Sequence, residues 1–161
     1  MDDFNRYDLI VFDWNGTLSR GLLPAAEKTP QQGLFPGVLD LLRRLRARGI
    51  KLAIATAASR FEMEYEIETH GLEGFFEAVY TLTEGPTKPD PFALIEAMRQ
   101  CGVLPERTLM VGDTRRDIFM AKNAGVSAIG VDYGLHHEKI LRDAGAIHVV
   151  SELKQLLEWV E

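Results

Sequence analysis

The sequence contains little of what secreted, disulfide-stabilised or membrane-spanning proteins require. Its only cysteine is Cys101, so an internal disulfide is excluded. Cys101 follows Met98 and Gln100 at a predicted helix end with no base nearby, so we interpret it as a packing residue rather than a nucleophile. No apolar run is long enough to cross a bilayer, and the first residues are acidic rather than basic. We therefore expect a cytoplasmic protein with no membrane partner.

Positive charge is also scarce. The 161 residues include 18 Lys and Arg against 24 Asp and Glu, a net charge of −6. Such a balance gives no broad basic surface, so nucleic acid is not an expected partner. The arginines between positions 43 and 48 alternate with Leu41, Leu42 and Leu45 at helical spacing. We interpret them as the solvent-facing side of a helix.

Internal repeats and low-complexity tracts are absent, and strand-like and helix-like segments alternate along the chain. This alternation is typical of βαβ units and a parallel sheet. We predict a single domain over residues 1–161, a three-layer α/β fold of Rossmann-like type with helices on both faces of a five- or six-stranded sheet. The predicted strands are 7–12, 50–55, 78–81, 109–111, 127–131 and 148–150. The predicted helices are 36–48, 91–101, 117–124, 138–144 and 152–160.

One segment carries two conflicting patterns. Residues 61–68 alternate apolar and acidic, which is typical of a half-buried strand. The same residues form apolar pairs four apart, and Ser59 with Glu62 makes a capping-box pattern. We predict a helix over 61–69 with its glutamates facing outward.

The connection after the first strand is short. Residues 19–33 contain Pro24, Pro30 and Gly33 and leave too little chain for a folded lid domain. We therefore expect a core without an inserted cap.

Polar side chains follow several predicted strands where each strand ends. Asp13 follows the first strand, Thr56 the second, Lys88 the third, and Asp113 and Asp117 the fourth. Each has an ordinary alternative, as a helix cap or a solvated loop residue. Parallel strands bring all five to one sheet edge, where open α/β sheets bind ligands. A nucleophile, oxygen-binding donors and a cation are what phosphoryl transfer requires.

This arrangement resembles the haloacid dehalogenase-like phosphohydrolases over nearly the whole chain. The phrases at 35–38 and 51–56 are similar to the phosphoglycolate phosphatase branch of that family. The matching motifs are Asp13-Trp14-Asn15-Gly16-Thr17, Ala55-Thr56-Ala57-Ala58, Lys88-Pro89 and Gly112-Asp113-Thr114-Arg115-Arg116-Asp117.

The resemblance implies a role for each motif. Asp13 would be the nucleophile that becomes an aspartyl-phosphate. Thr56 and the backbone N–H groups of Trp14, Asn15 and Ala57 would hold the phosphoryl oxygens. Lys88 would offset charge and orient Asp13.

The resemblance also implies a Mg²⁺ cofactor. Asp113 would bind the ion directly, together with the carboxylate of Asp13 and the backbone carbonyl of Asn15. Asp117 would support the ion through water or pair with Lys88. Oxygen ligands of this kind suit Mg²⁺, which keeps several waters.

Asn15 departs from the family pattern, which has a second aspartate at that position. The aspartate would protonate the leaving oxygen and then activate water, and an amide can do neither. We therefore expect an enzyme, a phosphate-monoester phosphatase whose binding is intact and whose turnover is weakened. Three explanations stay open: a natural enzyme for substrates with good leaving groups such as acyl phosphates, a substitution introduced to trap a complex, or a non-catalytic module that binds phosphorylated ligands. Asn15-Gly16 is also a pairing prone to deamidation.

Other candidates carry weaker signals. His136-His137 could reach the edge of the site, although a solvated loop pair is the simpler interpretation, and Tyr133-Gly134 is interpreted as a turn. Arg20, Arg115 and Arg116 could contact an anionic substrate or form surface ion pairs. A site without a cap would be open, so the resemblance implies a bulky or macromolecular phosphorylated substrate, or an oligomer whose neighbouring subunit covers the site.

Overall fold

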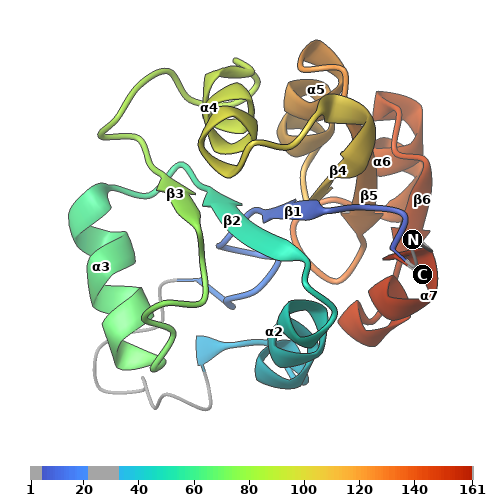
Figure 1. Cartoon of the computed structure of the whole chain (residues 1–161). Helices are drawn as coiled ribbons and strands as arrows, with labels where there is room; N and C mark the ends of the chain where they lie inside the picture. Colours follow the sequence, from blue (N-terminus) through green and yellow to red (C-terminus); the bar gives the residue numbers. More distant parts are fainter. Residues whose placement is uncertain (1–4, 22–32, 161) are drawn as a thin grey trace.

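A six-stranded parallel sheet forms the centre of the protein, as seen in the computed structural model, which describes residues 5–21 and 33–160. The strand order is β3-β2-β1-β4-β5-β6 (Figure 1). The strands are β1 (Leu9–Phe12), β2 (Lys51–Ala55), β3 (Ala78–Tyr80), β4 (Thr108–Gly112), β5 (Ser127–Val131) and β6 (His148–Val150). The predicted α/β class and parallel sheet are confirmed, with six strands.

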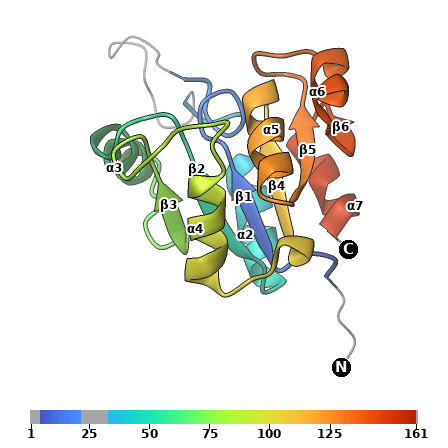
Figure 2. The same ribbon diagram turned by 90° about the horizontal axis from the view of Figure 1, so that it is seen from above.

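Helices cover both faces of this sheet (Figures 1 and 2). Helices α4 (Phe92–Cys101), α5 (Arg115–Asn123) and α6 (Glu138–Ala144) lie on one face. On the other face lie α2 (Val38–Ala47) and α7 (Leu156–Val160), with α3 (Arg60–Thr69) beside β3. Short 3₁₀ turns occupy Pro105–Arg107 and Leu153–Gln155, so the predicted last helix begins as 3₁₀.

The two faces follow from the period-2 alternation of strand side chains. In β1, Ile10 and Phe12 belong to the core beneath α2 and α7, whereas Leu9 and Val11 belong to the core beneath α4, α5 and α6. Every residue of β1 is buried. A central parallel strand therefore reads as a continuous apolar run, as in this sequence.

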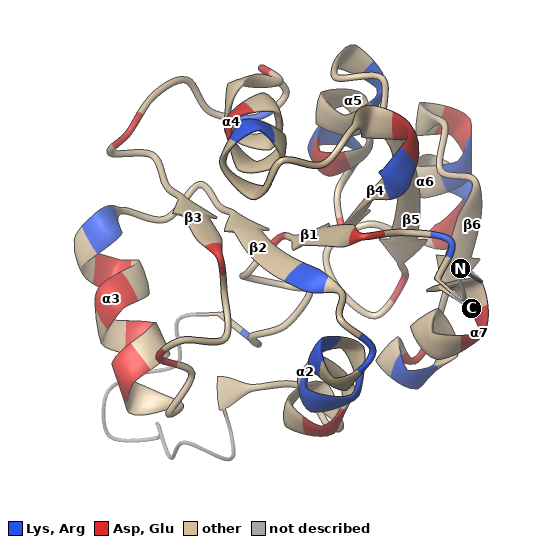
Figure 3. Cartoon of the chain, viewed as in Figure 1, with Lys and Arg blue, Asp and Glu red and all other residues tan. Residues whose placement is uncertain are grey.

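Two predictions about side chains on helices are confirmed. Leu41, Leu42 and Leu45 of α2 are buried, and its arginines form the blue outer side of the helix in Figure 3. Cys101 is free and buried at the end of α4, and burial raises the pKa of its thiol. A protonated, packed thiol is a poor nucleophile.

Helix α3 resolves the ambiguous segment. Ser59 caps it, because its hydroxyl accepts a hydrogen bond from the Glu62 N–H at 3.2 Å. The expectation that all its glutamates face outward is wrong for Glu66, which is buried. Glu66 lies one helical turn before His70, and its carboxylate is 3.1 Å from the His70 Nε2. This partner at i+4 allows the carboxylate to be buried.

The strand order places the ends of β1 and β4 next to each other. Phe12 is paired with Val111 of β4 and with Ile54 of β2, and the Asp13 N–H donates to the Val111 carbonyl at 2.9 Å. The residues that follow these strands therefore share one edge of the sheet. Most of the connection for which no lid was expected, residues 22–32, lies outside the described residues. No helix in the described ranges has the length and apolar character to span a bilayer.

Candidate active site

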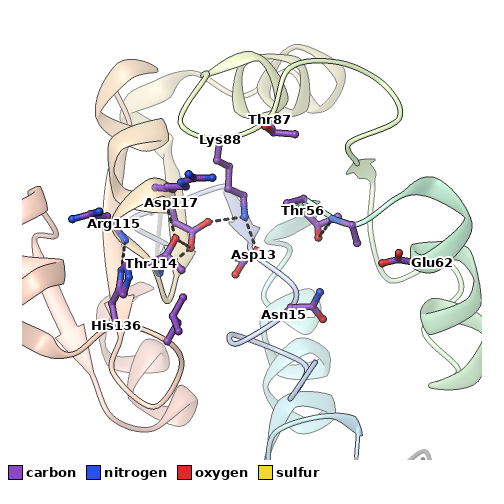
Figure 4. A pocket seen from close by; sticks show the side chains of 14 residues that line it. Asp13, Asn15, Thr56, Glu62, Thr87, Lys88, Thr114, Arg115, Asp117 and His136 are labelled. Carbon is purple, nitrogen blue, oxygen red and sulfur yellow. Dashed lines mark hydrogen bonds and ion pairs between the residues drawn. The ribbon is translucent and has the colours of Figure 1, made fainter. Parts of the chain in front are cut away.

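A pocket of about 500 Å³ lies at the carboxyl edge of the sheet (Figure 4). The sequence predicted many of its lining residues, namely Asp13, Asn15, Thr56, Ala57, Lys88 and Asp117. The weaker candidates Arg115, Arg116 and His136 also line the pocket, and the remaining lining residues are Ala58, Glu62, Thr87, Thr114 and Leu135. Segments more than 100 residues apart in the chain therefore meet at one site, as the strand ends predicted.

Lys88 joins two of the predicted carboxylates. Its Nζ lies 2.5 Å from Asp13 Oδ1 and 2.6 Å from Asp117 Oδ1, and all three side chains are almost fully buried. Burial alone would lower the pKa of Lys88, but the charges of Asp117 and Asp13 raise it above the ordinary lysine value. Lys88 is therefore an ammonium ion in the pocket, and the solvated-loop alternative is excluded.

Asp13 titrates unusually because it is buried. Desolvation, together with the neighbouring Asp113 carboxyl, raises its pKa to about 7 against the opposing effect of Lys88. Like-charged carboxylates in one site favour a proton or a cation between them. Added positive charge beside Asp13 would therefore favour its ionised form.

Asp113 has no lysine or arginine partner among the described residues, although it is only 2% exposed. Its Oδ2 accepts a hydrogen bond from the Leu135 N–H at 2.9 Å. The Thr17 hydroxyl lies 3.3 Å from both Asp113 Oδ1 and Asp13 Oδ2, so it can donate to either. The described residues therefore provide neutral hydrogen-bond donors for this buried carboxyl group but no positive charge beside it.

Asp117 has a different role from Asp113. Its Oδ2 accepts hydrogen bonds from the backbone N–H groups of Asp113 and Thr114, at 3.1 and 3.0 Å. Thr114 in turn caps α5 in a reciprocal capping box with Asp117. The alternative in which Asp113 caps this helix is therefore wrong. Of the two roles implied for Asp117, the described residues show the pairing with Lys88.

Asn15 and Thr56 lie on the other side of Asp13 from Asp117 (Figure 4). The Thr56 hydroxyl oxygen accepts a hydrogen bond from the Ala58 N–H at 3.1 Å, which orders the loop after β2. The Trp14 side chain is fully buried and does not line the pocket, so only its backbone is available for the predicted phosphate contact.

Gly16 lets the loop after β1 approach Asp113. It has a φ of +87°, and a Cβ atom at this position would overlap the Asp113 carboxylate. Gly134 does the same from the loop after β5, where a Cβ would lie 2.5 Å from Asp113 Oδ2. Tyr133 holds the loop after β5 against the loop after β1, since its hydroxyl donates to the Thr17 carbonyl at 2.6 Å. The backbone thus approaches Asp113 so closely at Gly16 and Gly134 that a residue with a Cβ atom would not fit there.

The acidic cluster fits a divalent cation. One oxygen from each of Asp13, Asp113 and Asp117 lies within 4.8 Å of the others. When all three carboxyl groups are ionised, they carry three negative charges against the one positive charge of Lys88, a net −2. All the donors are oxygens, which hard divalent cations prefer.

Sequence reasoning missed or misjudged several pocket residues. His136 is not a solvated loop residue: it lines the pocket, and its Nδ1 accepts a hydrogen bond from the Arg115 N–H at 2.9 Å. Glu62 was read only as a capping residue, yet it also lines the pocket. Arg20 lies elsewhere, with its guanidinium 5.6 Å from the centre of the Phe35 ring. No local pattern places His136 and Glu62 at the pocket, because these residues reach it through the tertiary fold.

Curated proteins share a large part of this sequence. A phosphoglycolate phosphatase from Pseudomonas putida is 34% identical over 125 residues, which cover 77% of this chain and 46% of that protein. A pyrophosphatase from Halalkalibacterium halodurans is 34% identical over 127 residues, 78% of this chain and 59% of that protein. The chain thus spans about half the length of the curated relatives it matches.

Solved structures share the fold. A predicted phosphoglycolate phosphatase from Haemophilus somnus superposes with a TM-score of 0.83 at 19% identity, covering 96% of this chain and 98% of that one. A haloacid dehalogenase-like family hydrolase from Streptococcus pneumoniae gives 0.79 at 17% identity, covering 96% and 98%. The family model described as haloacid dehalogenase-like hydrolase matches residues 23–131, which include Thr56, Lys88, Asp113 and Asp117, while Asp13 precedes this range. The chain belongs to the haloacid dehalogenase-like hydrolase family.

Proposed function

We propose that this protein is a Mg²⁺-dependent phosphate-monoester phosphatase that acts through an aspartyl-phosphate at Asp13. The observation that carries the proposal is the buried Lys88 ammonium between Asp13 and Asp117, with the unpaired Asp113 carboxylate beside them. A structural ion pair would not require a third buried carboxylate without a counterion. A phosphoryl-transfer site does, because a metal ion offsets this charge.

The first step is attack by the Asp13 carboxylate on the substrate phosphorus. A P–O bond forms to Asp13, and the bond to the leaving oxygen breaks with its electron pair. Lys88 and the Thr56 loop offset and bind the charge on the phosphoryl oxygens. In the second step, water attacks the phosphorus of the aspartyl-phosphate, which releases inorganic phosphate and restores the carboxylate.

Asn15 limits both steps. The leaving oxygen must take a proton from solvent, and the attacking water has no carboxylate at position 15 to accept its proton. General acid–base help is worth about 10²–10⁴-fold, so turnover is expected to be slow and to favour good leaving groups.

The cation would be held by Asp13, Asp113 and the carbonyl of Asn15, with Asp117 acting through Lys88. Mg²⁺ would supply positive charge that offsets the phosphoryl oxygens and keeps Asp13 ionised near neutral pH. None of these ligands requires an acidic side chain at position 15, so metal binding is expected to survive the substitution.

The names of the relatives provide the first substrates to test. These substrates are phosphoglycolate and pyrophosphate. We add p-nitrophenyl phosphate and acetyl phosphate, which have good leaving groups. We expect Mg²⁺-dependent release of phosphate by the natural chain, complete loss of it in Asp13→Asn, and retention in Asp143→Asn, a change at an exposed carboxylate on α6. Mg²⁺-dependent phosphate binding without turnover of any of these substrates would reject the proposal. It would instead support a non-catalytic module that binds phosphorylated ligands.

A further inference from the structure

Two arginines at the mouth of the pocket have no acidic partner. Arg115 and Arg116 begin α5, are exposed and line the pocket. Neither forms an ion pair with any carboxylate in the described part of the chain. Other arginines do, in the pairs Arg44–Asp40, Arg60–Glu84, Arg99–Glu96, Arg107–Asp8 and Arg142–Glu138. Arg115 and Arg116 are thus among the described arginines that have no carboxylate partner, and both of them line the pocket.

Their position is also unfavourable for α5 itself. The first turn of a helix carries the positive end of its dipole, so cations there oppose helix stability. Asp117 is the acidic residue of that turn, but it is fully buried and occupied by Lys88 and Thr114. Breaking a local rule without compensation is expected where a residue serves function.

His136 adds a third donor on the same side. Its ring Nδ1 accepts a hydrogen bond from the Arg115 backbone N–H, and the backbone N–H of His136 donates to the Asp113 carbonyl at 3.1 Å. Because Nδ1 is an acceptor, the ring proton is on Nε2, and this N–H has no partner among the described residues. Figure 4 shows Arg115 and His136 together on one side of Asp13, with Glu62 on the opposite side. The pocket mouth is thus basic toward α5 and acidic toward α3.

We propose that Arg115, Arg116 and His136 bind a second anionic group, a carboxylate or a second phosphate, carried by the leaving group of the substrate. The reacting phosphoryl group would lie between Asp13, Thr56 and Lys88. Glu62 would repel the second anion from the α3 side and so direct it toward α5. The inference rests on the proposed function and narrows its substrates to doubly anionic phosphate monoesters.

The test compares three ligands with similar two-carbon chains. Ethyl phosphate has a neutral tail, 2-phosphoglycolate a carboxylate, and ethylene glycol bisphosphate a second phosphate. Their dissociation constants are measured by calorimetry with Mg²⁺, on the natural chain, on Arg115→Gln/Arg116→Gln and on the control Arg142→Gln. Charged hydrogen bonds add about 1.5–3 kcal/mol, so at least one anionic-tail ligand should bind about ten-fold or more tighter than ethyl phosphate. This preference should disappear in the double variant and persist in Arg142→Gln.

The ratio between ligands separates the outcomes. A double variant that failed to fold would lose ethyl phosphate as well, and milder single changes, Arg115→Lys and Arg116→Lys, would then be measured by the same ratio. Equal binding of all three ligands by the natural chain, or an unchanged preference in folded arginine variants, would overturn the inference. Comparison of the carboxylate and bisphosphate ligands identifies which anion is preferred. The binding preference does not require turnover, so a preference in a protein without phosphatase activity would refute the proposed function and leave this subsite standing.

Discussion

Position 15 separates binding from turnover at the scale of a single residue. Asn15 lines the pocket, and the Gly16 N–H that follows it donates to the Ser19 carbonyl at 2.7 Å. Deamidation requires the Gly16 nitrogen to attack the Asn15 side chain, so this hydrogen bond protects the amide. The structure therefore favours a protein that keeps asparagine at this position.

Restoring the acid should raise turnover. We predict that Asn15→Asp increases kcat on an alkyl phosphate by about ten-fold or more, because general acid–base catalysis is typically worth about 10²–10⁴-fold. The gain should be smaller on p-nitrophenyl phosphate, whose leaving group needs little protonation, unless hydrolysis of the aspartyl-phosphate is rate-limiting. Steady-state kinetics of both proteins, with mass spectrometry to confirm residue 15, measures this. Equal rates on the alkyl phosphate with intact metal binding would mean that residue 15 is not the missing acid.

At the same scale, the motif residues were predictable from the strand ends, whereas the contact of His136 with the pocket was only one of two interpretations. Asp13, Thr56, Lys88 and Asp117 follow predicted strands, and parallel strands end at a common edge. His136 reaches the pocket only because the loop after β5 folds back against Asp113. The sequence contains no periodicity that reports such a long-range contact.

At the scale of elements, the loop after β1 is shaped by a glycine that no other residue can replace. Gly16 and Gly21 have almost the same φ, +87° and +89°, but only Gly16 lies against another group, the Asp113 carboxylate. A residue with a Cβ atom would therefore be strained at both positions, but it would overlap another group only at position 16.

Gly16→Ala should therefore lose divalent metal binding, whereas Gly21→Ala should keep it. Gly21→Ala should lose about 1–2 kcal/mol of stability, the cost of a left-handed conformation for a residue with a Cβ, and Gly16→Ala should lose more because of its overlap with Asp113. Calorimetric titration with Mg²⁺ and urea unfolding measure the two effects. If Gly16→Ala bound Mg²⁺ as well as Gly21→Ala, the close approach to Asp113 would not be needed for the metal site.

Element type was more predictable than element detail. Strand β1 begins at Leu9 rather than at the predicted Tyr7, although Tyr7 is buried. An apolar pattern predicts burial, but a strand also requires hydrogen bonds to a neighbouring strand. Residues 61–68 are helical despite their alternating pattern, and Ser59 caps this helix. The burial of Glu66 was not predictable, since it depends on the tertiary surroundings of its partner His70.

At the scale of the whole molecule, the parallel sheet was predictable but its strand order was not. Period-2 and period-3.6 patterns identify strands and helices without stating which strands are neighbours. The order places β1 and β4 side by side, so Asp13 and Asp113 meet in one buried cluster. The fold thus concentrates uncompensated negative charge, which opposes its own stability.

The free energy of unfolding of the metal-free protein should therefore depend on pH. Burial raises the pKa of Asp13 to about 7 and also raises that of Asp117, so the folded state holds protons that the unfolded state releases. Stability should therefore fall as pH rises from about 4, near the unfolded pKa, to about 7, and stay low above it. The pKa of Asp8 is lowered by its hydrogen bonds with Arg107. The pKa of Glu84 is lowered, against the effect of burial, by hydrogen bonds with Thr81 and Arg60. These two groups make stability rise with pH, but only below this window.

Thermal unfolding with EDTA between pH 5 and 8 measures this slope, and Asp13→Asn should flatten it. Mg²⁺ should reverse the loss at pH 8, because it binds the ionised carboxylates of the folded state. At a hundred times its Kd the ion adds about 2.7 kcal/mol, which corresponds to a rise in Tm of roughly 5–11 °C for a protein of this size. Asp113→Ala should abolish the rise, whereas Asp143→Asn should keep it. An equal Mg²⁺ shift in Asp113→Ala would place the cation elsewhere, and a flat profile in EDTA would show that the buried carboxylates are already neutralised by groups of the protein itself.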